Sequence, residues 1–117
     1  MILFLDDDPE RTKKFKSYCP SAKCVLTSEE CILELQKEWD TLFLDHDLGG
    51  EVYVDTDRED CGMEVVRYIV EHKPKIFQII VHSLNTPAAK EMVRKLKDAG
   101  YRAQYVPFTI LFKRIKF

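Results

Sequence analysis

The chain has 117 residues, 45% hydrophobic and 32% charged, which suits one domain built on a single core. Its 18 lysines and arginines face 20 acidic residues, so nothing indicates an extended nucleic-acid surface. The first apolar run, Ile2–Leu5, is too short for a secretion signal or a membrane span, and we expect a cytoplasmic protein. The four cysteines form no C-x-x-C pair, which favours reduced structural thiols over a zinc site. The oligomeric state stays open.

Short apolar runs alternate with helical patterns along the chain, which is typical of an α/β domain with a parallel sheet. Several runs are apolar at successive positions, as strands buried on both faces should be. The predicted strands are Ile2–Leu5, Lys23–Leu26, Thr41–Leu44, Phe77–His82 and Arg102–Val106.

Helix start signals stand between these runs. Asp8 precedes Pro9, which predicts a cap followed by proline at the first helical position. Thr27 and Glu30 form a capping box ahead of an apolar pattern that reaches Trp39. Further apolar stripes include Met63, Val66, Ile69 and Val70, and then Ala89, Met92, Val93 and Leu96 between Thr86-Pro87 and Gly100. The last segment, Phe108–Phe117, predicts a short basic amphipathic helix.

In an open parallel sheet the ligand site lies outside the carboxyl ends of the strands. The first predicted strand runs into Asp6-Asp7-Asp8, the third into Asp45-His46-Asp47, and the fourth into His82-Ser83-Leu84-Asn85. Carboxylates that converge repel one another and need a cation or protons. Oxygen ligands without a thiolate favour Mg²⁺ or Mn²⁺, so we expect at least one of Asp6 and Asp7 to bind metal. Asp8 is better explained as a helix cap.

The opening segment, ILFLDDDPE, resembles the start of response-regulator receiver domains, in which the acid pair binds Mg²⁺. Leu42-Phe43-Leu44-Asp45 resembles their strand with the phospho-accepting aspartate, and CGMEVV at positions 61–66 resembles the helix that follows. Ser83 stands where those domains carry a hydroxyl beside the acyl phosphate. The resemblance covers essentially the whole chain. It implies a single receiver-like (flavodoxin-like) domain over residues 1–117, with strand order 2-1-3-4-5, helices on both faces, and metal on Asp6, Asp7 and Asp45.

Two departures from the receiver pattern bear on function. Receivers end the fifth strand with a lysine before a proline, whereas Val106 precedes Pro107 here, and a charge-assisted contact to a phosphoryl oxygen is lost. Residues 49–61 also form a longer and more acidic connection than usual. A solvated, mobile lid over the pocket is the favoured interpretation of its acidic stretch, Glu51–Asp60.

The segments LDHDLGG at 44–50, VHSLN at 81–85 and VPF at 106–108 are similar to a narrower branch, the receiver domains predicted to process cyclic phosphates. The resemblance implies a phosphorylated small molecule or a nucleotide end as substrate. Opening a cyclic phosphodiester needs a base for water, an acid for the leaving oxygen, and stabilisation of charge on phosphorus. His46 and His82 are candidates for the acid and base roles beside Asp45 and Asp47. A metal ion would polarise the phosphoryl oxygen.

Several of these residues have a structural alternative. His82 and His46 could serve only to order loops through a carboxylate such as Asp47. Ser83 and Asn85 are predicted to donate hydrogen bonds to substrate, but Asn85 could equally cap the helix that begins at Thr86.

Three functions are therefore open. The favoured one is a metal-dependent cyclic phosphodiesterase or phosphohydrolase. The second is a stand-alone response regulator phosphorylated on Asp45, and the third is a catalytically inactive binding module.

Overall fold

The computed structural model describes residues 1–48 and 55–116 and contains a five-stranded parallel sheet in the order β2-β1-β3-β4-β5. The strands are β1 (Ile2–Leu5), β2 (Lys23–Val25), β3 (Trp39–Leu44), β4 (Ile76–Val81) and β5 (Ala103–Tyr105). The helices are α1 (Pro9–Tyr18), α2 (Ser28–Glu34), α3 (Gly62–His72), α4 (Thr86–Asp98) and α5 (Phe108–Arg114). The α/β architecture and the order 2-1-3-4-5 predicted from the sequence are confirmed.

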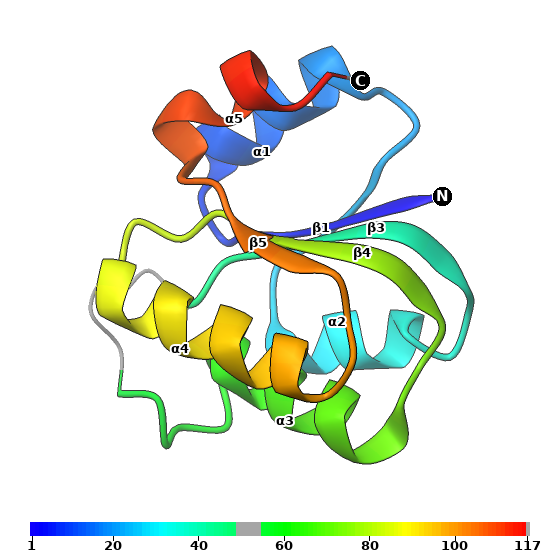
Figure 1. The fold of residues 1–117 in the computed structure, drawn as a ribbon. Helices are drawn as coiled ribbons and strands as arrows, with labels where there is room; N and C mark the ends of the chain where they lie inside the picture. Colours follow the sequence, from blue (N-terminus) through cyan, green and yellow to red (C-terminus); the bar gives the residue numbers. More distant parts are fainter. Residues whose placement is uncertain (49–54, 117) are drawn as a thin grey trace.

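Helices cover both faces of the sheet. Figure 1 shows α1 and α5 side by side on one face and α2, α3 and α4 on the other. Two hydrophobic cores result, one on each face. The core under α1 and α5 is smaller and rich in aromatic rings.

The strands feed both cores because successive side chains point to opposite faces. Along β1, Phe4 joins the core under α1 and α5, whereas Leu3 and Leu5 join the opposite core. The register places Phe43 of β3 beside Phe4, and Ile80 of β4 beside Phe43. Two positions further along each of these strands, on the same face, the chain reaches the carboxyl edge of the sheet, where the candidate site lies.

The predicted helix starts form as their chemistry requires. Asp8 caps α1 by accepting from the Arg11 amide at 2.9 Å, with Pro9 at the first helical position. Thr27 caps α2 by accepting from the Glu30 amide at 3.1 Å. Each cap fixes where the chain leaves the sheet edge and turns into a helix.

Two details of the predicted helices were wrong. Trp39 does not continue the stripe of α2 but begins β3, where its backbone amide donates to Lys75 at 3.0 Å and pairs the strand with β4. Its indole N–H donates to the Glu34 carbonyl at 2.7 Å, so the ring packs beside the end of α2 without belonging to it. Val70 is exposed, and Val65 takes the buried place on α3 instead.

Residues 49–54, which include the first part of the predicted lid, lie outside the described residues. The part that is described, residues 55–60, is hydrogen-bonded to helices on both sides. Ser28 Oγ of α2 donates to the Glu59 carbonyl at 3.0 Å. Arg67 of α3 donates to the carbonyls of Thr56 and Arg58 at 2.7 and 2.6 Å.

Within residues 1–48 and 55–116, no helix has the length and apolar character needed to cross a bilayer. All four cysteines are free thiols.

Candidate functional site

The candidate site is the first row of residues beyond the sheet. The last paired residues of β1, β3, β4 and β5 are Leu5, Leu44, Val81 and Tyr105. The residues that follow them are Asp6, Asp45, His82 and Val106. The Asp45, His82 and Val106 amides still donate to the preceding row of carbonyls, at 3.1, 2.9 and 2.9 Å. Because side chains alternate along a strand, this row faces the same side as Phe4, toward α1 and α5.

Three members of this row form a compact group of donors, which we call the acidic cluster: Asp6, Asp45 and His82. One ligand atom from each lies within 4.8 Å of the other two. Their exposed fractions are 0, 4 and 1%. Two carboxylates this close and this buried need compensating charge or protons, because a low-dielectric interior penalises both burial and mutual repulsion.

Arg11 of α1 supplies positive charge to the cluster. Its Nε donates to Asp6 Oδ2 at 2.8 Å and its Nη2 donates to Asp6 Oδ1 at 2.9 Å, a bidentate contact. The same Nη2 lies 3.6 Å from Asp45 Oδ2. The guanidinium therefore bridges the ends of β1 and β3.

The two carboxyl groups respond to this environment in opposite directions. Burial alone would raise the pKa of Asp6, but hydrogen bonds from His82 and Arg11 hold that pKa well below its usual range. Burial raises the pKa of Asp45 to about 6, and the neighbouring Asp6 charge adds to the rise. Asp6 is thus a permanent anion near neutral pH, whereas Asp45 releases its proton close to pH 6 in the absence of a metal.

His82 is held between aromatic rings at the base of the cluster. Its ring stacks on Phe4 with centroids 4.8 Å apart and an interplanar angle of 10°, and Phe108 meets it at a steep angle, 6.0 Å away. Nε2 lies 3.1 Å from Asp6 Oδ2. Nδ1 is buried and has no hydrogen-bond partner. These rings fix the imidazole so that Nε2 faces the carboxylate.

His46 belongs to the other face of the sheet, because it follows Asp45 by one residue and the side chains alternate. Its ring is completely buried, with Nδ1 2.9 Å from Asp47 Oδ1 and Nε2 without a hydrogen-bond partner. Burial alone would lower the pKa of His46, but Cys61 and Asp47 raise it. The carbonyl of His46 accepts from the Gly62 amide at 2.8 Å, which joins this loop to the start of α3.

Asn85 connects the helix cap to Asp47. Its Oδ1 accepts from the Ala88 amide at 3.4 Å, which caps α4, and its Nδ2 donates to Asp47 Oδ1 at 3.2 Å. Ser83 Oγ accepts from the Asn85 amide at 3.1 Å. Both side chains are buried, and Asn85 caps α4, which is one of the two roles weighed for it.

The three consecutive aspartates take different positions. Asp6 is in the acidic cluster, Asp8 caps α1, and Asp7 is half-buried between them. Among the described residues, the compact donor group includes Asp6 and Asp45 and takes His82 rather than Asp7 as its third member.

The acidic cluster fits a divalent cation. Carboxylate oxygens suit Mg²⁺ and Mn²⁺, and the imidazole is a donor that suits Mn²⁺ better than Mg²⁺. Asp45 Oδ2 is buried and accepts no hydrogen bond, so an ion would give it the partner it lacks. Asp6 and Asp45 are the residues that would hold such an ion, with His82 within reach.

Sequence reasoning overlooked Arg11. The signal was available, because Arg11 is a cation in the first turns of the helix that follows an acidic strand end. Cys61, at the cap of α3, was also overlooked; its buried thiol donates to the Arg58 carbonyl at 3.3 Å, and the neighbouring His46 imidazole lowers its pKa against the effect of burial.

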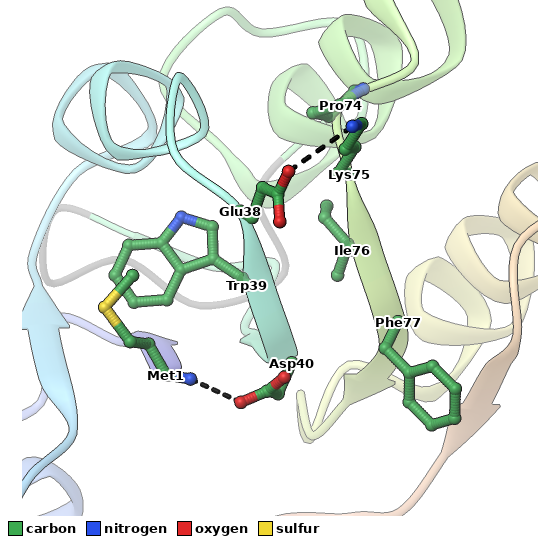
Figure 2. A pocket seen from close by; sticks show the side chains of 8 residues that line it. All are labelled: Met1, Glu38, Trp39, Asp40, Pro74, Lys75, Ile76 and Phe77. Carbon is green, nitrogen blue, oxygen red and sulfur yellow. Dashed lines mark hydrogen bonds and ion pairs between the residues drawn. The ribbon is translucent and has the colours of Figure 1, made fainter.

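A separate hollow of about 670 Å³ lies at the opposite edge of the sheet, between the starts of β3 and β4 (Figure 2). Trp39, Asp40, Ile76 and Phe77 line it, together with Met1. None of the predicted site residues takes part in it.

Comparison with known families identifies the chain. The family model described as the cyclic-phosphate processing receiver domain matches residues 1–98. The chain therefore belongs to this receiver family. No curated protein sequence matches it.

Solved structures share the fold at low sequence identity. A response regulator from Colwellia psychrerythraea is 16% identical, with 97% of each chain covered and a TM-score of 0.61. A chain in which a yeast Spc42 coiled-coil segment is fused to another structure is 17% identical over 96% of this chain and 71% of that one, with a TM-score of 0.63. The chain of a structure of two RcsB dimers bound to DNA is 20% identical over 99% of this chain and 62% of that one, with a TM-score of 0.58.

Proposed function

We propose that this receiver domain is a metal-assisted phosphoesterase that opens a cyclic phosphate on a phosphorylated small molecule or a nucleotide end. The observation that carries the proposal is the acidic cluster, in which Asp6, Asp45 and His82 place their donor atoms within 4.8 Å of one another at the carboxyl edge of the sheet. The family to which the chain belongs supports the substrate class.

The metal-binding residues proposed are Asp6 and Asp45, with Asp7 as a ligand from the rim. A bound Mg²⁺ or Mn²⁺ would polarise a phosphoryl oxygen and stabilise the negative charge that develops there. The buried setting of the two carboxylates strengthens any such electrostatic contact, because water does not screen it.

Hydrolysis requires that a water oxygen bond to phosphorus while the ester P–O bond of the ring breaks. One proton must leave the water and one must reach the departing oxygen, so the number of protons is conserved. His82, paired with Asp6 at 3.1 Å, is the imidazole of the acidic cluster, and we assign one of these proton transfers to it, while the other proton exchanges with solvent. His46, paired with Asp47 at 2.9 Å, lies on the other face of the sheet and orders the loop that follows β3.

We assign substrate-binding roles to Ser83 and Asn85, which follow β4 at the same edge of the sheet as the acidic cluster. Asn85 Nδ2 already donates to Asp47, so it can orient that carboxylate as well as a phosphoryl oxygen. Val106 directly follows β5 and is fully buried, so this position contributes no charge to the phosphoryl group.

The test measures hydrolysis of a nucleoside 2′,3′-cyclic phosphate by the purified protein in Mg²⁺ or Mn²⁺. We expect His82→Ala to lower turnover on the order of 10²- to 10⁴-fold, the usual effect of one positioned acid or base. His72→Ala is the matched control, because His72 is exposed at the end of α3, where it stacks on the Tyr68 ring and lies within hydrogen-bond distance of the Tyr68 carbonyl. Wild-type protein that hydrolyses none of a panel of cyclic phosphates would contradict the proposal.

A phospho-accepting receiver is the second candidate, favoured by Asp45 itself. Its Oδ2 is free of hydrogen bonds and lies 3.6 Å from Arg11, an arrangement that would suit an acyl phosphate. Acetyl phosphate with Mg²⁺ would then add a phosphoryl mass that Asp45→Ala abolishes. An adduct without hydrolysis would favour signalling, and the absence of both activities would leave a binding module.

A further inference from the structure

The contacts between Arg11 and Asp6 indicate how the acidic cluster receives its metal. This inference rests on the proposed metal site. Asp6 accepts four hydrogen bonds. Oδ1 accepts from the Asp8 amide and from Arg11 Nη2, both at 2.9 Å. Oδ2 accepts from Arg11 Nε at 2.8 Å and faces His82 Nε2 at 3.1 Å. An ionised carboxylate offers about four lone-pair sites, so Asp6 is saturated.

A cation can therefore bind Asp6 only if one of these donors leaves. The Asp8 amide belongs to the backbone that leads into α1 and cannot move by itself. His82 is 1% exposed and fixed between Phe4 and Phe108. Arg11 differs from both, because its side chain is 29% exposed and ends a flexible stem that can swing toward solvent.

Electrostatic repulsion also indicates that Arg11 is the donor that leaves when a metal binds. A divalent ion between Asp6 and Asp45 would take the position that the guanidinium now spans, since Arg11 Nη2 contacts both carboxylates. An ion bound there would lie close to the guanidinium, and two neighbouring cations repel strongly in a buried setting. The ion and the guanidinium exclude each other by charge as well as by geometry.

We propose that Arg11 is the resident counter-ion of the acidic cluster and competes with a divalent metal for Asp6. In the metal-free protein the guanidinium neutralises the buried carboxylates and keeps the pocket folded. When a metal binds, Arg11 is released to the rim of the site. There it supplies a cationic fork for a phosphoryl oxygen, the charge that Val106 cannot give from the fifth strand.

The test is the affinity for Mg²⁺ and Mn²⁺ alone, measured by calorimetry on wild type, Arg11→Gln and Arg11→Lys. We expect Arg11→Gln to bind either metal about 10- to 100-fold more tightly than wild type, within the usual range for coupled sites. Arg11→Lys should stay near wild type, because it keeps a competing charge. Arg94→Gln is the control: Arg94 lies exposed on α4, paired with Glu91 and Asp98, and its loss should change nothing.

An unchanged or weaker metal affinity in Arg11→Gln would overturn the inference. If wild type and Arg11→Gln bind the metal measurably and with equal affinity, competition by Arg11 is refuted but the proposed metal site is not. Failure of the proposed function would appear separately, as a lack of cyclic-phosphate turnover in protein that binds metal.

A second measurement uses wild-type protein and does not depend on the folding of a variant. The Arg11 Nε–H resonance should exchange slowly with solvent in metal-free protein, because it is bonded to Asp6. Saturating Mg²⁺ should accelerate this exchange and leave the Arg67 Nε–H, bonded to Glu64 at 2.7 Å, unaffected. An Arg11 Nε–H that stays protected in the metal-saturated protein would contradict displacement.

Discussion

Charged residues gather at both edges of the sheet, but the two edges treat them differently. At the amino edge, the Met1 amino group pairs with Asp40, and Lys75 pairs with Glu38 at 3.3 Å (Figure 2). The Lys75 and Glu38 side chains are 81% and 76% exposed. At the carboxyl edge, Asp6 is fully buried and its charge is met by Arg11 and His82.

The comparison shows that burial, rather than the number of charges, distinguishes a candidate site. Water screens the amino-edge pairs, so they contribute little to stability. The acidic cluster lies under α1 and α5, where each charge needs a specific partner and pKa values diverge.

The start of α3 packs against the carboxyl edge with no room for a side chain on Gly62. A Cβ on Gly62 would lie 1.9 Å from the Asp45 carbonyl oxygen, so we expect Gly62→Ala to lower the free energy of unfolding by about 3 kcal/mol or more. The matched change at the amino edge is Gly100→Ala, where nothing lies within 4 Å and only the positive φ of 95° is unfavourable. That variant should lose about 1 kcal/mol. Urea denaturation compares the two, and equal losses would refute the difference in packing.

Removing the buried anion should be the next largest effect. Asp6→Asn leaves Arg11 and His82 without their carboxylate, and we expect a loss of about 2–3 kcal/mol at pH 7, somewhat reduced because Arg11 reaches solvent. The pKa of Asp6 is depressed by folding, so this stabilisation exists above the unfolded value of 3.8 and fades as the pH falls below it.

The control is Asp40→Asn at the amino edge, which should be nearly neutral. A loss in Asp6→Asn that stays constant between pH 7 and pH 3 would show that the effect comes from packing and not from charge.

Ionisation of Asp45 should affect the free energy of unfolding in the opposite direction to that of Asp6. Its pKa rises from 3.8 to about 6 on folding, so the native state binds more protons than the unfolded state between these values, and stability falls as the pH rises through that window. We expect Asp45→Asn to stabilise metal-free protein by about 1–2 kcal/mol at pH 7.5 and to have little effect at pH 4. Urea titrations in EDTA at the two pH values measure this, and a variant less stable than wild type at pH 7.5 would contradict it.

The smallest effect is expected at the amino edge. Glu38→Gln removes the ion pair with Lys75, in which both side chains are largely exposed, and should change stability by no more than about 0.5 kcal/mol. Thermal unfolding at low and high salt should agree for the variant and wild type. A larger change in stability would mean that this exposed ion pair stabilises the fold as strongly as a buried one, which would contradict the difference between the edges.

Much of the fold was predictable from local sequence. Strand β1 was predicted at its observed bounds, and the caps at Asp8 and Thr27 formed as expected, because capping and burial are decided by a few neighbouring residues. Trp39 was misplaced because its apolar ring suits a helix stripe and a strand equally well. Only pairing with β4 settles the choice.

The candidate site, like the fold, was predictable only in part from local sequence. Knowing that Asp6, Asp45 and His82 end three parallel strands was enough to expect them at one edge. Which of the neighbouring polar residues share a face depends on register, since a shift of one residue moves every side chain to the other side. The register brings Asp6, Asp45 and His82 together under α1 and sends His46 toward Cys61 and α3.

The sequence alone determined the receiver architecture, the edge that carries the acidic residues and the loss of the fifth-strand lysine at Val106. The tertiary structure decided which acids meet, how their pKa values separate, and that Arg11 is their counter-ion. The physical reason is that strand and helix signals act between residues a few positions apart, whereas Arg11 reaches Asp45 only after β1, β3 and α1 have packed together.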